Sequence, residues 1–128
     1  SITTDVLNNI SGEFKLAVCL TENNIITWQK DGQDNVEDYQ HNHVLRAVLI
    51  DEIMSTSSNY IAGEEVQTTI NYDLATLEQF NVDYSENIAE LGNGIAGGWV
   101  PENMQIVAYI YNVNTKEILQ VEESHLNN

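Results

Sequence analysis

The chain has 128 residues, enough for one domain, and its twenty acidic against four basic side chains give a net charge of -16. Such a field repels phosphate backbones and anionic lipid surfaces, so nucleic acid is excluded as a partner. No apolar run approaches the roughly 20 residues of a membrane-spanning helix. The single cysteine, Cys19, rules out an intramolecular disulfide.

The first half of the chain predicts several strands. Residues 2–7 are a provisional strand, and large apolar residues occupy every second position of 14–20, as in a half-buried strand. The β-branched and aromatic run at 25–29 predicts the strand that returns from 14–20 in a hairpin. Residues 39–50 are too many for one straight strand, since most have about five or six residues, so we expect a bend or bulge there.

The second half alternates again at 66–74, and 75–98 then break the pattern with weak helical spacing and several glycines. We expect that segment to be a long irregular excursion. Residues 104–111 are apolar on both faces and predict a central, covered strand, which a turn at 112–116 joins to a closing strand. The pattern predicts a single all-β domain over 1–128, an antiparallel sandwich of about seven or eight strands, with a barrel as second choice.

Two motifs resemble the outer membrane protein 28 family, cell-envelope proteins of Gram-negative bacteria whose activity is undefined. They are the Asp-Tyr-Gln-His-Asn-His-Val-Leu-Arg run at 38–46 and the Val-Ala-Tyr-Ile-Tyr-Asn hairpin that begins at Val107. The resemblance covers about two-thirds of the chain. It implies an immunoglobulin-like sandwich, an outer-membrane-associated or extracellular location, and further N-terminal domains, so we expect this chain to be a fragment of a longer envelope protein. It implies no catalytic residues.

His41 and His43 are two residues apart, so on a strand they would share a face and could share a metal ion. A third ligand is missing from the pattern, and the alternative is that the imidazoles hydrogen-bond to neighbouring groups at a bend. Arg46, the only arginine, lies among apolar residues, which predicts a structural pairing with a carboxylate. A clamp for a ligand carboxylate is its functional alternative.

Four carboxylates fall within eight residues, at Asp31, Asp34, Glu37 and Asp38. Oxygen ligands on a loop suit calcium, but the spacing matches no EF-hand, and the alternative is a solvated acidic loop. The aromatic residues could form a platform for sugar rings, and Trp99, in its glycine-rich loop, is the member that we expect to be exposed.

No nucleophile motif is present, and Cys19 lies within a predicted strand where burial raises a thiol pKa, so we do not expect an enzyme. The sequence predicts a non-catalytic interaction or spacer module of a bacterial cell-envelope or surface protein. Its partner would be a protein or glycan at the cell surface. The alternative is a ligand-binding module that recognises glycan or peptide through loop aromatics, or calcium through the acidic 31–38 loop, and no other cofactor is expected.

Overall fold

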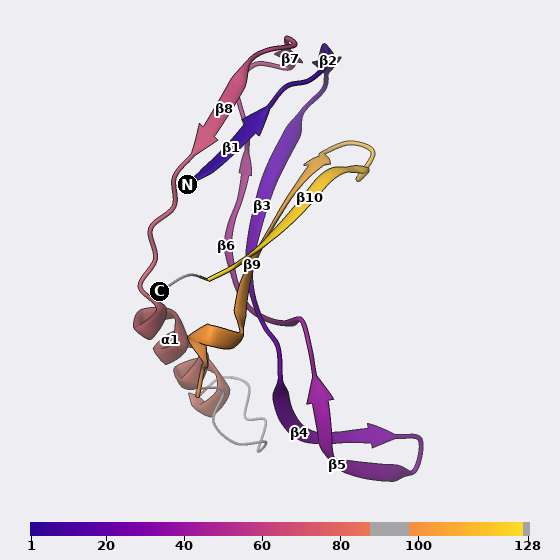
Figure 1. The fold of residues 1–128 in the computed structure, drawn as a ribbon, viewed down its shortest axis with the longest axis vertical. Helices are drawn as coiled ribbons and strands as arrows, with labels where there is room; N and C mark the ends of the chain where they lie inside the picture. Colours follow the sequence, from indigo (N-terminus) through magenta and orange to yellow (C-terminus); the bar gives the residue numbers. More distant parts are fainter. Residues whose placement is uncertain (88–97, 127–128) are drawn as a thin grey trace.

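A computed structural model describes residues 1–87 and 98–126 of the chain and shows a mostly β, antiparallel fold (Figure 1). The strands are β1 (Ile2–Asp5), β2 (Ile10–Ser11), β3 (Phe14–Glu22), β4 (Ile25–Asp31), β5 (Asp34–His41), β6 (Val44–Ile53), β7 (Asn59–Tyr60), β8 (Glu65–Thr68), β9 (Met104–Asn112) and β10 (Ile118–His125). The helices are α1 (Leu74–Asn87) and the short η1 (Pro101–Asn103). The predicted all-β, sandwich-like architecture is confirmed, although the described residues form ten strands rather than seven or eight.

The main sheet has four antiparallel strands in the order β10-β9-β3-β6. The alternation of β3 decides its orientation: Phe14, Leu16, Val18 and Leu20 are all buried on one side of the sheet, which we call the inner face. The predicted central position of 104–111 is confirmed, because β9 lies between β10 and β3. The core therefore lies along β3 and β9 rather than in the loops.

The predicted hairpin between 14–20 and 25–29 is wrong. Strand β4 pairs with β5, and β3 pairs with β6 and β9 instead. Asn24 has a positive φ of 60°, and the Asn23 amide donates to the carbonyl of Asn103, so the chain leaves the main sheet where β3 ends. As a result, β4 and β5 form an arm that projects from one end of the molecule (Figure 1).

The predicted bend within 39–50 is confirmed. Strand β5 ends at His41 and β6 begins at Val44, and His43 between them adopts a left-handed φ of 53°. Two register shifts follow in the pairing of β6 with β3. The long apolar run is thus divided between the projecting arm and the edge of the main sheet.

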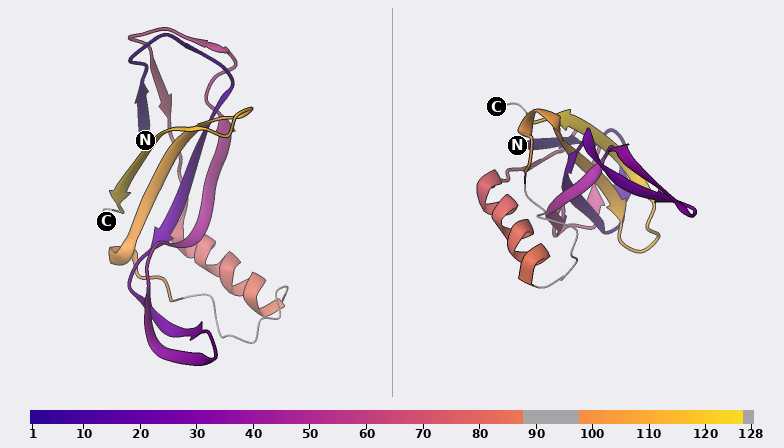
Figure 2. Two further views of the ribbon diagram at one scale, coloured as in Figure 1. Left: turned by 90° about the vertical axis from the view of Figure 1, so that its right-hand side faces the viewer. Right: turned by 90° about the horizontal axis from the view of Figure 1, so that it is seen from below.

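A second, narrower layer covers part of the inner face. It consists of the antiparallel pair β1–β8 and the helix α1, which lie on the same side of the main sheet (Figures 1 and 2). The two-residue pair β2–β7 closes the end of the molecule opposite the arm. Strand β8 ends at Thr68, so the predicted strand at 66–74 is short.

The prediction of an irregular excursion at 75–98 needs correction, because α1 occupies Leu74–Asn87. The helix begins after Asp73, whose carboxylate accepts hydrogen bonds from the Ala75 amide and the Thr76 hydroxyl, as an N-cap residue does. Residues 88–97 of the predicted excursion lie outside the described residues. Across the described parts of the chain, no helix is long and apolar enough to cross a membrane.

Candidate functional site

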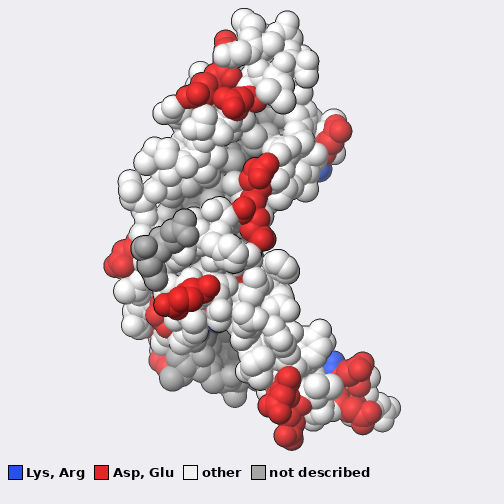
Figure 3. All heavy atoms as spheres, viewed as in Figure 1, with Lys and Arg blue, Asp and Glu red and all other residues white. Residues whose placement is uncertain are grey.

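The predicted acidic site lies on the β4–β5 arm. Asp31 and Asp34 face each other across the tip of the hairpin, and Glu37 and Asp38 follow along β5. All four residues are exposed, and Figure 3 shows groups of red carboxylates at this end of the molecule. Within residues 1–87 and 98–126, no three His, Cys, Asp or Glu side chains are gathered so that they could hold a metal ion. The four carboxylates therefore lie exposed along the arm, and calcium binding there stays a prediction.

The bend separates the surroundings of the two predicted histidines. The His41 ring packs edge-on against Tyr39, with ring centroids 4.8 Å apart, and its Nε2 is buried without a hydrogen-bond partner among the described residues. His43 has left the strand conformation, is largely exposed, and places its Nδ1 3.8 Å from the Glu123 carboxylate. Each imidazole therefore has its own neighbour, and within the described part of the chain neither belongs to a group of three His, Cys, Asp or Glu side chains that could hold a metal ion.

Arg46 forms the structural pairing that the sequence predicts. Its Nε donates to Glu22 Oε2 at 2.7 Å, and Glu22 is only 2% exposed. The other carboxylate oxygen of Glu22 accepts the Val100 amide at 3.0 Å. The end of β3, the start of β6 and the segment before η1 are held together by one buried carboxylate, which sequence reasoning did not single out.

Trp99 belongs to the same junction and is not the exposed aromatic residue that we expected. The Arg46 guanidinium lies 5.8 Å from the centre of its ring, and the indole N–H is buried without a partner among the described residues. Its backbone amide donates to Glu78 of α1. The exposed tryptophan is Trp28, on the β4–β5 arm. The local pattern gave no signal for this exposure, because Ile26 and Trp28 share one face of the strand, and an apolar face is ordinarily predicted to be buried.

A further apolar surface lies on the side of the main sheet that faces away from β1, β8 and α1. We call it the outer face. Figure 2 shows the strands of the main sheet side by side with the second layer and the helix behind them. In β3, the residues on the outer face are those that alternate with the buried ones, and the pairing register shows which residues of the neighbouring strands share that face with them. The apolar and aromatic residues of the outer face on these neighbouring strands are Leu45, Val48, Ile53, Val107, Tyr109, Tyr111, Ile118 and Val121.

The outer-face side chains are most accessible on the two edge strands of the main sheet, β6 and β10. Leu45, Val48, Ile53, Ile118 and Val121 are exposed, and Val107, Tyr109 and Tyr111 are half-buried. The sequence predicts that both faces of 104–111 are covered, because both are apolar. The structure covers part of the inner face and leaves the outer face open over the described residues.

A polar cluster crosses one end of the outer face. The Tyr111 hydroxyl lies 2.8 Å from Asp51 Oδ1, and Lys15 forms an ion pair with the other carboxylate oxygen at 3.3 Å. The hydrogen bond from Tyr111, together with Lys15, lowers the pKa of Asp51. The same hydrogen bond raises the pKa of the Tyr111 hydroxyl. Cys19 lies farther along the same face, and burial raises the pKa of its thiol.

Comparison of the chain with protein-family models, with curated proteins and with solved structures finds no match.

Proposed function

We propose that this chain is a non-catalytic interaction module of a bacterial cell-envelope protein, and that its outer face docks a protein partner. One observation carries the proposal: the main sheet is apolar on both faces, and the second layer formed by the described residues lies on only one of them. Continuous exposed apolar surface of this kind marks interaction sites in soluble proteins. The envelope location is supported by the resemblance of 38–46 and the hairpin from Val107 to the outer membrane protein 28 family.

The partner surface should be apolar at its centre and basic at its rim. Asp51 and Glu123 belong to the outer face, and the net charge of the whole chain is -16. Opposite charge at the rim would speed encounter and fix orientation, while apolar contact at the centre would supply most of the affinity. A second copy of the chain fits this face poorly, because it would bring the same acidic charge.

The experiment is site-specific photo-crosslinking in the native cell envelope. A photoreactive residue replaces Val48 on the outer face or, as a matched control, Ile26 on the β4–β5 arm, since both side chains are 57% exposed. We expect one discrete crosslinked protein from position 48 and none from position 26. Val121→Glu on the same face should abolish that product, because it places a charge in the apolar contact.

Equal products from positions 48 and 26, or a product that survives Val121→Glu, would show that the outer face is not the docking surface.

A further inference from the structure

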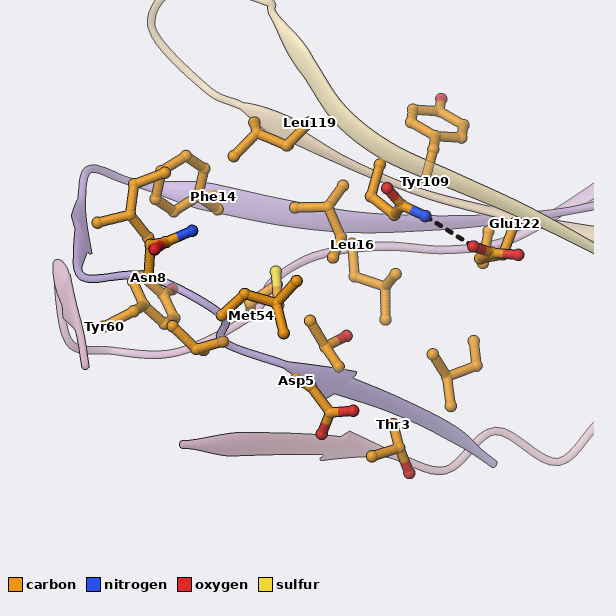
Figure 4. A pocket seen from close by; sticks show the side chains of 18 of the residues that line it. Thr3, Asp5, Asn8, Phe14, Leu16, Met54, Tyr60, Tyr109, Leu119 and Glu122 are labelled. Carbon is orange, nitrogen blue, oxygen red and sulfur yellow. Dashed lines mark hydrogen bonds between the residues drawn. The ribbon is translucent and has the colours of Figure 1, made fainter. Parts of the chain in front are cut away.

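The second layer leaves part of the inner face open. A two-stranded layer, β1–β8, faces a four-stranded sheet, and beside β1 a groove of about 670 Å³ remains. Its floor includes Phe14, Leu16 and Ile110 of the main sheet. Figure 4 shows Leu16 and Met54 lying between the main sheet and the strand that carries Thr3 and Asp5.

The groove continues along the sheet. A second hollow of about 550 Å³ shares Ile2, Thr3, Ala108 and Glu122 with the first, and Val18, Leu20 and Ile106 contribute to its lining. Pockets of such volume are ordinary for ligand sites, but this one follows the direction of the strands. An elongated occupant therefore fits it better than a compact one.

One wall of the groove is the unpaired edge of β1. Every residue from 2 to 10 lines the groove. Successive side chains of a strand point to opposite faces, so a groove that touches every residue of β1 must also touch the backbone along the edge of that strand. The Val6 amide donates to Glu64, and its carbonyl accepts the Gly63 amide, so Val6 is bonded toward β8. By antiparallel alternation the backbone groups of Thr3 and Asp5 point the other way. No described strand pairs with them.

The groove is acidic where it is charged. Asp5 and Glu122 line it with their carboxylates, and no Lys or Arg among the described residues does. The Gln120 amide donates to Glu122 at 2.6 Å and holds that carboxylate at the rim (Figure 4). The occupant should be apolar toward the floor and basic toward the rim.

We propose that the groove accepts an extended segment of a partner protein, which adds a third strand to the β1–β8 layer. Backbone hydrogen bonds to the free edge at Thr3 and Asp5 would hold the segment, and apolar side chains at every second position would fill the groove. Lys or Arg at the intervening positions would face the acidic rim. This site lies on the side of the main sheet opposite the outer face and is independent of it.

The segment comes from another protein rather than from a second copy. The four basic residues of this chain are at positions 15, 30, 46 and 116, so no stretch of it alternates apolar with basic residues over the length of a strand. Charge complementarity also favours a foreign segment, because each copy carries a net charge of -16.

The test uses an acetylated and amidated peptide of about seven residues in which lysine alternates with valine, a usual strand length. A control peptide has the same composition with the lysines and valines in separate blocks, so its charge is identical. Binding is measured by calorimetry, and amide hydrogen exchange is followed in the free and the peptide-bound protein. We expect the alternating peptide to bind at least about tenfold more tightly than the block peptide.

Two variants locate the contact. Thr3→Pro removes the amide on the free edge without removing a bond to β8 and should weaken binding about tenfold, whereas Thr3→Ala keeps the amide and should bind like the wild type. If Thr3→Pro fails to fold, the wild-type exchange data decide the matter, because the amides of Thr3 and Asp5 must slow when peptide is added.

Three results would overturn the proposal. Equal binding of the two peptides would indicate charge attraction alone. Protection confined to Val48 or Val121 would place the peptide on the outer face. Slowed exchange at Thr3 and Asp5 on self-association, or on addition of dodecanol without peptide, would assign the groove to a second copy or to a lipid.

Discussion

Replacing Arg46 by methionine should be among the most destabilising single changes in this chain. Methionine retains the apolar part of the side chain but leaves Glu22, 2% exposed, without its cation. Breaking a buried pair by removing one partner costs about 3–5 kcal/mol, and the lower end applies because the Arg46 side chain is still 14% exposed. For a chain of this length, about 3 kcal/mol corresponds to a fall in Tm of roughly 10–15 °C.

The assay is urea unfolding followed by circular dichroism, which does not depend on the environment of Trp99. Lys15→Met is the matched control, because it removes the same charge from the exposed pair with Asp51 and should change stability little. In Glu22→Gln/Arg46→Met the buried charge is gone, and the glutamine oxygen can still accept the Val100 amide. This double variant should recover about half of the loss.

The reasoning is refuted if Arg46→Met costs no more than the Lys15→Met control, or if the double variant is less stable than Arg46→Met alone. Either result would mean that the Glu22 carboxylate is solvated in spite of its position, or that the guanidinium stabilises the junction chiefly by packing on Trp99.

Four further outcomes are expected. Leu20→Ala should cost about 2–5 kcal/mol in urea unfolding, whereas Leu45→Ala on the exposed outer face should cost far less; equal losses would mean that the inner face is not the core. Gly12→Ala should cost about 1–3 kcal/mol, since Gly12 has a φ of 151° and a Cβ there would lie 3.0 Å from the ring of a neighbouring phenylalanine; an unchanged unfolding curve would contradict this geometry. The lowered pKa of Asp51 means that its contribution to stability is present above the ordinary aspartate pKa, about 3.9, and is lost as the pH falls through the folded value; Asp51→Asn should therefore flatten the acid side of a stability–pH profile, and an identical profile would contradict the assignment. The raised pKa of Cys19 predicts slower reaction with a disulfide reagent at pH 8 than glutathione shows, and a faster reaction would place the thiol in an open, electropositive setting.

Parts of the candidate site could be predicted from local residue chemistry. The pairing of Arg46 with a carboxylate follows from a lone guanidinium among apolar residues, and the bend at His43 follows from a run too long for one strand. The identity of the carboxylate could not be predicted, since Glu22 lies 24 residues earlier in the chain and only strand pairing brings it to Arg46. For the same reason, Trp99 looked exposed within a glycine-rich loop although Arg46 lies over its ring.

The sequence by itself determined that the chain forms antiparallel strands, that 104–111 is central, and that the molecule carries a strong negative field. These properties depend on side-chain alternation and composition, which are local or additive. Only the tertiary structure decided that β4 turns away from β3 to pair with β5, that α1 forms within the expected irregular segment, and which apolar face is covered. Alternation shows that a strand has an apolar face, but the layer that buries this face depends on contacts between residues far apart in the chain. That is why the outer face and the groove beside β1 emerge only from the folded molecule.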